Sequence, residues 1–203
     1  MDSHPGEHER PAGAARRSFV KLFGSSRDLV PRTWTTLSCV QRAGNNAVCA
    51  YPAGKRPRQV QDGATMFMSR LVDDPRDNMI YGRAIARHHE EGADDATEGD
   101  FRIREWRRGF PHYVRVHSPE FMGGTLAMAV SLNELMDALE FETFDSTLRN
   151  YEARRGNLDP RRAIGPQPAV MLTPMASAWI NARLEEKFMN DGKLSPADLA
   201  DVW

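Results

Sequence analysis

Arginine is concentrated in one short polar segment of this chain, residues 149–167. The segment holds five arginines, no lysine and two acidic residues, Glu152 and Asp159, so it has a local excess of three positive charges on a chain whose net charge is -1. A planar guanidinium group donates two parallel hydrogen bonds to phosphate oxygens, so this composition is typical of phosphate recognition. The five arginines are Arg149, Arg154, Arg155, Arg161 and Arg162.

Side-chain amides in the same segment offer a second kind of contact. Asn150, Asn157 and Gln167 carry donors and acceptors that suit a base edge or a sugar. We expect residues 149–167 to form a long polar loop, because loops of this length in compact domains are commonly functional or disordered. The alternative is a solvated loop in which the arginines pair with nearby carboxylates. These carboxylates are Glu140, Glu142 and Asp145.

An aromatic side chain surrounded by arginines is the second candidate for contact with a nucleic acid. Trp106 has three such neighbours in sequence, Arg104, Arg107 and Arg108. A base stacked on an aromatic ring contributes roughly 1–3 kcal/mol to binding. We expect Trp106 and Arg83 to line a cleft together with the arginine-rich loop, and the alternative for Trp106 is packing in the core.

The sequence carries no recognisable catalytic signature. Neither a Gly-x-Ser-x-Gly elbow nor a Gly-Lys-Ser/Thr phosphate loop occurs. The adjacent pair His88 and His89, and the pair His112 and His117, each point to opposite faces of a strand. We therefore expect no metal site and no cofactor. An enzyme that uses His112 or His117 as an acid or base on a phosphorylated substrate stays an alternative.

The strands predicted around these residues form a mostly antiparallel β-core. Residues 63–72 and 79–87 indicate a hairpin, in which Gly82 is expected to mark a bulge or a close backbone approach. Residues 112–117 alternate in character as a third strand does. Val170 and Leu172 suggest a final short strand.

Helices are predicted mainly in the last third of the chain. Ser131 and Glu134 form a capping box at the start of a helix that extends to Leu139. A second helix is expected from Met175 to about Asn190, after Thr173 and Pro174. The fold class is therefore α+β, with a small β-core packed by C-terminal helices. We expect residues 1–18 to be a disordered leader and residues 19–203 to be a single domain.

The predicted hairpin resembles the central strand pair of PUA-like barrels of the EVE and ASCH groups. The likeness rests on the strand from Gly63 to Val72 and on the run Ile80-Tyr81-Gly82-Arg83-Ala84, within Gly63–Arg87. It implies a small β-barrel with a cleft for a modified base or an RNA segment. The segment from Trp106 to Gln167 resembles bacterial proteins of similar length that have no assigned function.

Composition limits the partners that this chain can take. A net charge of -1 argues against a dedicated duplex-DNA binder. No stretch is apolar for the roughly 18–20 residues of a membrane helix, and the scarcity of cysteine, at Cys39 and Cys49, suggests the cytoplasm. We expect a binding module for a nucleotide, RNA or DNA (single strand or modified base). The alternatives are an enzyme on a phosphorylated substrate and a protein-interaction module, and the oligomeric state is not readable.

Overall fold

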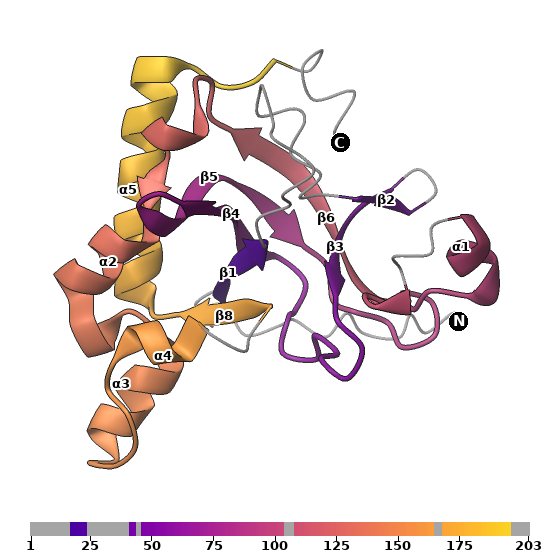
Figure 1. The fold of residues 1–203 in the computed structure, drawn as a ribbon, viewed down its shortest axis with the longest axis horizontal. Coiled ribbons are helices and arrows are strands. Elements are labelled where there is room, and N and C mark those ends of the chain that lie inside the picture. Colours follow the sequence, from indigo (N-terminus) through magenta and orange to yellow (C-terminus); the bar gives the residue numbers. More distant parts are fainter. Residues whose placement is uncertain (1–16, 24–40, 44–45, 104–107, 165–167, 196–203) are drawn as a thin grey trace, which may run out of the picture.

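The computed structural model describes residues 17–23, 41–43, 46–103, 108–164 and 168–195, and within these ranges the chain is α+β, as predicted (Figure 1). Trp106, Gln167, Cys39 and residues 1–16 of the expected leader lie outside the described residues. None of the described helices is long and apolar enough to cross a membrane.

One mixed, curled sheet forms the centre of the molecule. Its strand order is β2-β3-β6-β5-β4-β1-β8, and β7 pairs with β5 beside this path. Only β1 and β4 are parallel among the described pairs, so the expectation of a mostly antiparallel core is confirmed. The strands are β1 (Ser18–Phe23), β2 (Gln41–Ala43), β3 (Asn46–Tyr51), β4 (Ala64–Asp73), β5 (Arg76–Ala86), β6 (His112–Phe121), β7 (Val130–Ser131) and β8 (Ala169–Leu172).

The predicted hairpin is β4 and β5. Both strands extend into residues 73–78, which separate the two predicted strands, and the pairing continues as far as Asp73 and Arg76. The register shifts between Met68 and Ser69, whose partners are Gly82 and Ile80, so Tyr81 is the extra residue of a bulge. A Cβ atom on Gly82 would lie 2.4 Å from the Glu120 carbonyl oxygen of β6. The expected close approach at Gly82 is therefore confirmed, and glycine is required because β6 leaves no room for a side chain.

The helices α2 to α5 lie together on one side of the sheet, and α1 lies apart from them at the opposite side of the molecule (Figure 1). At the start of α2, Ser131 Oγ accepts a hydrogen bond from the Glu134 amide at 3.0 Å, as the predicted cap requires. Thr173 caps α5 in the same way. The helices are α1 (Glu98–Ile103), α2 (Leu132–Leu139), α3 (Asp145–Glu152), α4 (Pro160–Ile164) and α5 (Pro174–Asp191), with 3₁₀ turns at Leu126–Met128 and Glu140–Glu142.

The core lies between the sheet and these helices. Phe19 and Phe67 from the sheet are fully buried with Ile180 and Leu184 from α5. Complete burial of an apolar side chain of this size contributes about 1.5–3 kcal/mol. The face of α5 that carries Ile180 and Leu184 is thus the face that attaches the C-terminal helix to the sheet.

The expectation that residues 149–167 form a loop is wrong over much of its length. Residues 149–152 end α3, and α4 occupies Pro160–Ile164. Pro160 occupies the first helical position of α4, and the Asp159 side chain accepts a hydrogen bond from the Arg161 amide at 2.9 Å. Both are signals of a helix N-terminus, and the loop prediction did not take them into account. Only residues 153–159 connect two helices.

Candidate functional site

Five of the predicted site residues with charge lie on one projection of the molecule, which we call the arginine arm (residues 145–164). It consists of α3, the connection 153–159 and α4, and it extends away from the sheet below β8 (Figure 1). All five arginines are exposed, so the arm presents them on a protruding part of the molecule.

The connection within the arm has a defined geometry. Asn150 Nδ2 donates to the Asn157 carbonyl at 2.9 Å, and the Arg155 amide donates to the Asn150 carbonyl at 3.0 Å. Gly156 has a φ of +74°, and a Cβ atom there would lie 2.9 Å from the Asn150 side chain. Asn150, which we predicted to contact a ligand, is placed as a brace that holds this turn.

The arginines of the arm divide into two groups. Arg149 pairs with Asp145 at 2.6 Å and Arg161 pairs with Asp137. Arg162 lies 3.8 Å from Asp159 and is largely exposed. The alternative that we kept open from the sequence, pairing with nearby carboxylates, thus holds for Arg149, although Asp137 and not Glu140 or Glu142 is the partner of Arg161.

Arg154 and Arg155 form the second group. Both are exposed, and neither has an ion-pair partner within the part of the chain that the structure describes. Arg154 has a φ of 49°, which turns the chain just after α3 and aims the connection outward. Within the arm, these two cations are the ones without an ion pair among the described residues.

An exposed aromatic ring lies beside them and was missed from the sequence. Tyr151 stacks on Phe141, with ring centroids 4.0 Å apart and an interplanar angle of 15°. Tyr151 is nevertheless 51% exposed, and its carbonyl accepts from the Arg154 amide at 3.0 Å. The two rings come from different elements ten residues apart, so no periodic pattern in the sequence announces the pair.

Arg83, the predicted site residue from the hairpin, has a different environment. Its Nε donates to Glu120 at 2.7 Å, Nη1 donates to Asn181 at 2.5 Å, and Nη2 pairs with Glu185. Burial opposes the charged form, but the bonds to the two carboxylates raise the pKa of Arg83 above its ordinary value. This guanidinium group joins β5, β6 and α5.

Two cavities, one lined by Arg83 and the other by Arg149, share one lining side chain. Arg149 lines a cavity of about 530 Å³ with Arg17 and Thr173, and Arg83 lines one of about 470 Å³. Asn181 lines both. The structure therefore brings these two predicted residues near a common side chain, while Arg154 and Arg155 line neither of these cavities.

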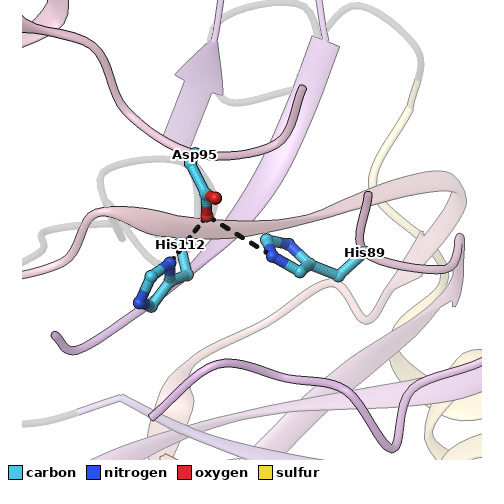
Figure 2. Close-up of side chains that lie close together, drawn as sticks. All are labelled: His89, Asp95 and His112. Atoms are coloured by element: carbon cyan, nitrogen blue, oxygen red, sulfur yellow. Dashed lines mark hydrogen bonds and ion pairs between the residues drawn. The ribbon is translucent and has the colours of Figure 1, made fainter. Parts of the chain in front are cut away.

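Three polar side chains converge elsewhere, at the start of β6 (Figure 2). We call His89, Asp95 and His112 the histidine cluster. Asp95 Oδ1 lies 2.7 Å from His112 Nδ1 and 3.4 Å from His89 Nε2, and one ligand atom from each residue lies within 4.8 Å of the others. This is the arrangement of two imidazoles and a carboxylate that binds metal ions in many proteins.

Outer contacts fix the members of the cluster. His89 Nδ1 faces the Tyr113 carbonyl at 2.6 Å, and Asp95 Oδ2 accepts from the Gly92 amide at 2.9 Å and from Arg56 at 3.0 Å. Burial favours the neutral acid, but the hydrogen bonds from Gly92 and His112, with the charge of Arg56, hold the pKa of Asp95 below its ordinary value. Asp95 is therefore an anion with one oxygen directed at both imidazoles.

The cluster did not follow from local spacing. The members of each sequence pair differ in environment: His88 and His117 are exposed, whereas His89 and His112 are largely buried. One member of each pair meets at Asp95, through an isolated antiparallel bridge between Asp95 and His112. Only the tertiary path of residues 88–96 shows this.

Neither a family model, a curated protein nor a solved structure matches this chain. The function is therefore inferred from the chemistry of the two regions just described. The arginine arm offers cations and an aromatic face to solvent, whereas the histidine cluster offers nitrogen and oxygen ligands at a partly buried point.

Proposed function

We propose that this protein is a binding module for single-stranded nucleic acid, and that the arginine arm is its contact surface. The observation that supports this most directly is the half-exposed ring of Tyr151, whose carbonyl accepts from the Arg154 amide, within four residues of Arg154 and Arg155, two arginines that have no ion-pair partner among the described residues. A stacking face with adjacent cations is the combination that binds bases and phosphates without requiring a duplex.

Stacking supplies the first part of the interaction. Phe141 covers one face of Tyr151 at 4.0 Å, so a base added to the outer face extends an existing stack. The ring is already held in position, which lowers the conformational entropy lost on binding. Each stacked base contributes roughly 1–3 kcal/mol.

Charge supplies the second part. Two arginines without an ion-pair partner among the described residues neutralise about two phosphates. For two phosphates on a single strand, the slope of log K against log salt is about -1.4. The modest number of available cations, on a chain of net charge -1, favours a single strand or a nucleotide over duplex DNA.

The fold is compatible with this role. The curled mixed sheet and the close approach at Gly82 support a PUA-like core, which is the finer fold assignment that we propose for β4 and β5. We also retain a cytoplasmic location as part of the proposal, supported by the scarcity of cysteine.

Fluorescence anisotropy tests the proposal directly. Labelled single-stranded RNA, single-stranded DNA and duplex DNA are titrated with the full chain at two salt concentrations. We expect salt-sensitive binding to the single strands, and its loss in the double variant Arg154→Gln/Arg155→Gln. The matched control is Arg161→Gln/Arg162→Gln, which removes the same charge from the same arm and is expected to bind within about twofold of the unaltered protein, because Arg161 is already paired.

Two outcomes contradict the proposal. The first is no binding of any probe at low salt. The second is equal weakening in both double variants, which would mean that net charge and not this surface attracts the nucleic acid.

A further inference from the structure

We infer that His89, Asp95 and His112 form a binding site for one divalent transition-metal ion of the zinc class. The site lies where β6 begins, near α1 and on the opposite side of the molecule from the arginine arm (Figures 1 and 2). It is independent of the proposed nucleic-acid surface.

The orientation of His89 is the strongest observation for a cation at this point. Its Nδ1 lies 2.6 Å from the Tyr113 carbonyl, which only accepts hydrogen bonds, so Nδ1 carries the proton. In the neutral ring Nε2 then carries a lone pair and can only accept a hydrogen bond. It faces an oxygen of Asp95, which is a second acceptor. The side chain is 2% exposed and Nε2 has no hydrogen-bond partner among the described residues, so in the neutral ring two buried acceptors face each other with no hydrogen between them. A cation between them resolves this juxtaposition, either a metal ion or a second proton on the ring, and a zinc titration distinguishes the two.

The distances are close to those that such a metal ion requires, although the ligand atoms of the two histidines, within 4.8 Å of each other, must approach by up to about 1.4 Å. Ligand bonds of about 2.0–2.2 Å at tetrahedral angles separate the ligand atoms by about 3.4 Å. His89 Nε2 and Asp95 Oδ1 are already 3.4 Å apart. His112 Nδ1 and Asp95 Oδ1, now 2.7 Å apart in a hydrogen bond, move apart by roughly 0.7 Å as the His112 proton moves to Nε2 and the bond is replaced by two bonds to the ion.

Outer contacts of the kind found around metal ligands are present. Ligating histidines donate their second ring nitrogen to a carbonyl or carboxylate, and ligating carboxylates are themselves hydrogen-bonded. His89 has the Tyr113 carbonyl, and Asp95 has Arg56 and the Gly92 amide.

The loop that carries two of the ligands is also braced. Buried Asp94 accepts from the Glu90 amide at 2.9 Å and pairs with Arg115 of β6 at 2.6 Å. The Tyr113 amide donates to the Asp94 carbonyl at 2.9 Å. The ligands are therefore held close to their positions before an ion binds, which limits the ordering that binding requires.

The ligand set selects the class of ion. Two imidazoles and one carboxylate favour zinc, cobalt, nickel or iron, whereas magnesium and calcium prefer oxygen ligands. The described residues supply three ligands, so the fourth position of a tetrahedral ion is left to water.

Isothermal titration of zinc chloride into the chelator-treated full chain tests the site. We expect binding of one zinc ion that magnesium does not reproduce, visible absorption bands on addition of cobalt, and a rise in melting temperature with zinc. His112→Gln and Asp95→Asn are each expected to weaken zinc binding at least tenfold. The matched control is His117→Gln, which removes an exposed histidine from the same strand and leaves zinc binding unchanged.

Circular dichroism shows whether each variant is folded. If one variant loses its folded spectrum, zinc binding is compared only between the unaltered protein and the folded variant. His112 is hydrogen-bonded to Asp95 alone in the cluster, whereas Asp95 faces Arg56, His89 and His112, so His112→Gln is the variant expected to retain the fold. Absence of one-to-one zinc binding overturns the site. Zinc binding that is unchanged in both folded variants also overturns it, since the ion would then occupy other histidines of the chain.

Discussion

The arginine arm and the histidine cluster lie at opposite sides of the molecule and are built in opposite ways (Figure 1). The arm is continuous in sequence and exposed, and it is attached to the rest of the molecule through β8 and the turn Glu140–Glu142. The cluster joins residues from a loop and a strand that are distant in sequence, and its histidines are largely buried. Composition is therefore informative about the first region and uninformative about the second, because a local excess of charge is visible in a sequence and a tertiary convergence is not.

The largest effect that we expect distinguishes the two regions by stability. Asp95→Asn removes the anion that faces Arg56, His89 and His112 in the metal-free protein. Hydrogen bonds to charged groups contribute about 1.5–3 kcal/mol, so we expect the free energy of unfolding to fall by about 2–3 kcal/mol. Urea denaturation measures this. An unchanged free energy of unfolding would mean that the cluster is not part of the stable framework.

Tyr151→Ala tests the opposite behaviour in the arm. Loss of one stacked base is expected to weaken single-strand binding by roughly 1–3 kcal/mol, which is about 5- to 150-fold. The change in unfolding free energy should be smaller, about 0.5–1.5 kcal/mol, because one aromatic pair is lost. Anisotropy and urea denaturation measure the two quantities. Tyr151→Phe keeps the ring and should bind normally, and a large loss of binding in that control would exclude stacking as the cause.

Arg83→Gln separates an arginine that stabilises the fold from those that bind a ligand. Its guanidinium group is shared by Glu120, Asn181 and Glu185. We expect a loss of about 1–2 kcal/mol in unfolding free energy with single-strand binding within twofold of normal. A variant that unfolds normally but no longer binds would place Arg83 on the ligand surface after all.

The same network predicts a dependence of stability on pH. Burial favours the neutral form of Glu120, but its bonds to Lys193 and Arg83 hold its pKa below the ordinary 4.5. A lowered pKa in the folded state means that the stabilisation is complete above 4.5 and is lost as the pH falls through the folded-state pKa. The difference in unfolding free energy between the unaltered protein and Glu120→Gln should therefore narrow below pH 4.5. A difference that stays constant from pH 7 to pH 3 would contradict the assignment.

The smallest effect is expected at the paired arginines of the arm. Arg161 pairs with exposed Asp137, and Arg162 lies 3.8 Å from Asp159. Exposed ion pairs contribute about 0–1 kcal/mol, so Arg161→Gln/Arg162→Gln should change the unfolding free energy by less than about 1 kcal/mol. A thermal melt at low and high salt checks this, and a large loss would show that α4 depends on these pairs.

The elements that could be predicted are those whose signals are local. The alternation in residues 112–117, the Ser131 cap and the Thr173-Pro174 start each depend on neighbours within a few residues, and the structure has β6, α2 and α5 there. The close approach at Gly82 was predicted correctly because a glycine inside a strand commonly marks a bulge or a close approach of another backbone. The helices α3 and α4 were missed because their exposed, arginine-rich faces hide the short apolar stripe that a helix normally shows.

The two regions of the site differ in the same respect. The arginines of residues 149–162 were found from composition, but the sequence could not tell that Arg161 is paired with Asp137 while Arg154 and Arg155 have no such partner among the described residues. The stack of Tyr151 on Phe141 and the meeting of His89 with His112 both depend on packing between separate elements. No local spacing encodes contacts of that kind.

The position of β1 has a consequence for how the chain assembles. This strand lies between β4 and β8, so that Ser18 is paired with both Thr65 and Leu172. During synthesis, β1 can dock on β4 long before β8 has left the ribosome, and until then its outer edge is an open template for strand addition. The nascent protein is therefore prone to pairing with other strands during this interval. The interval ends when β8 and α5 have been synthesised and β8 covers the edge of β1.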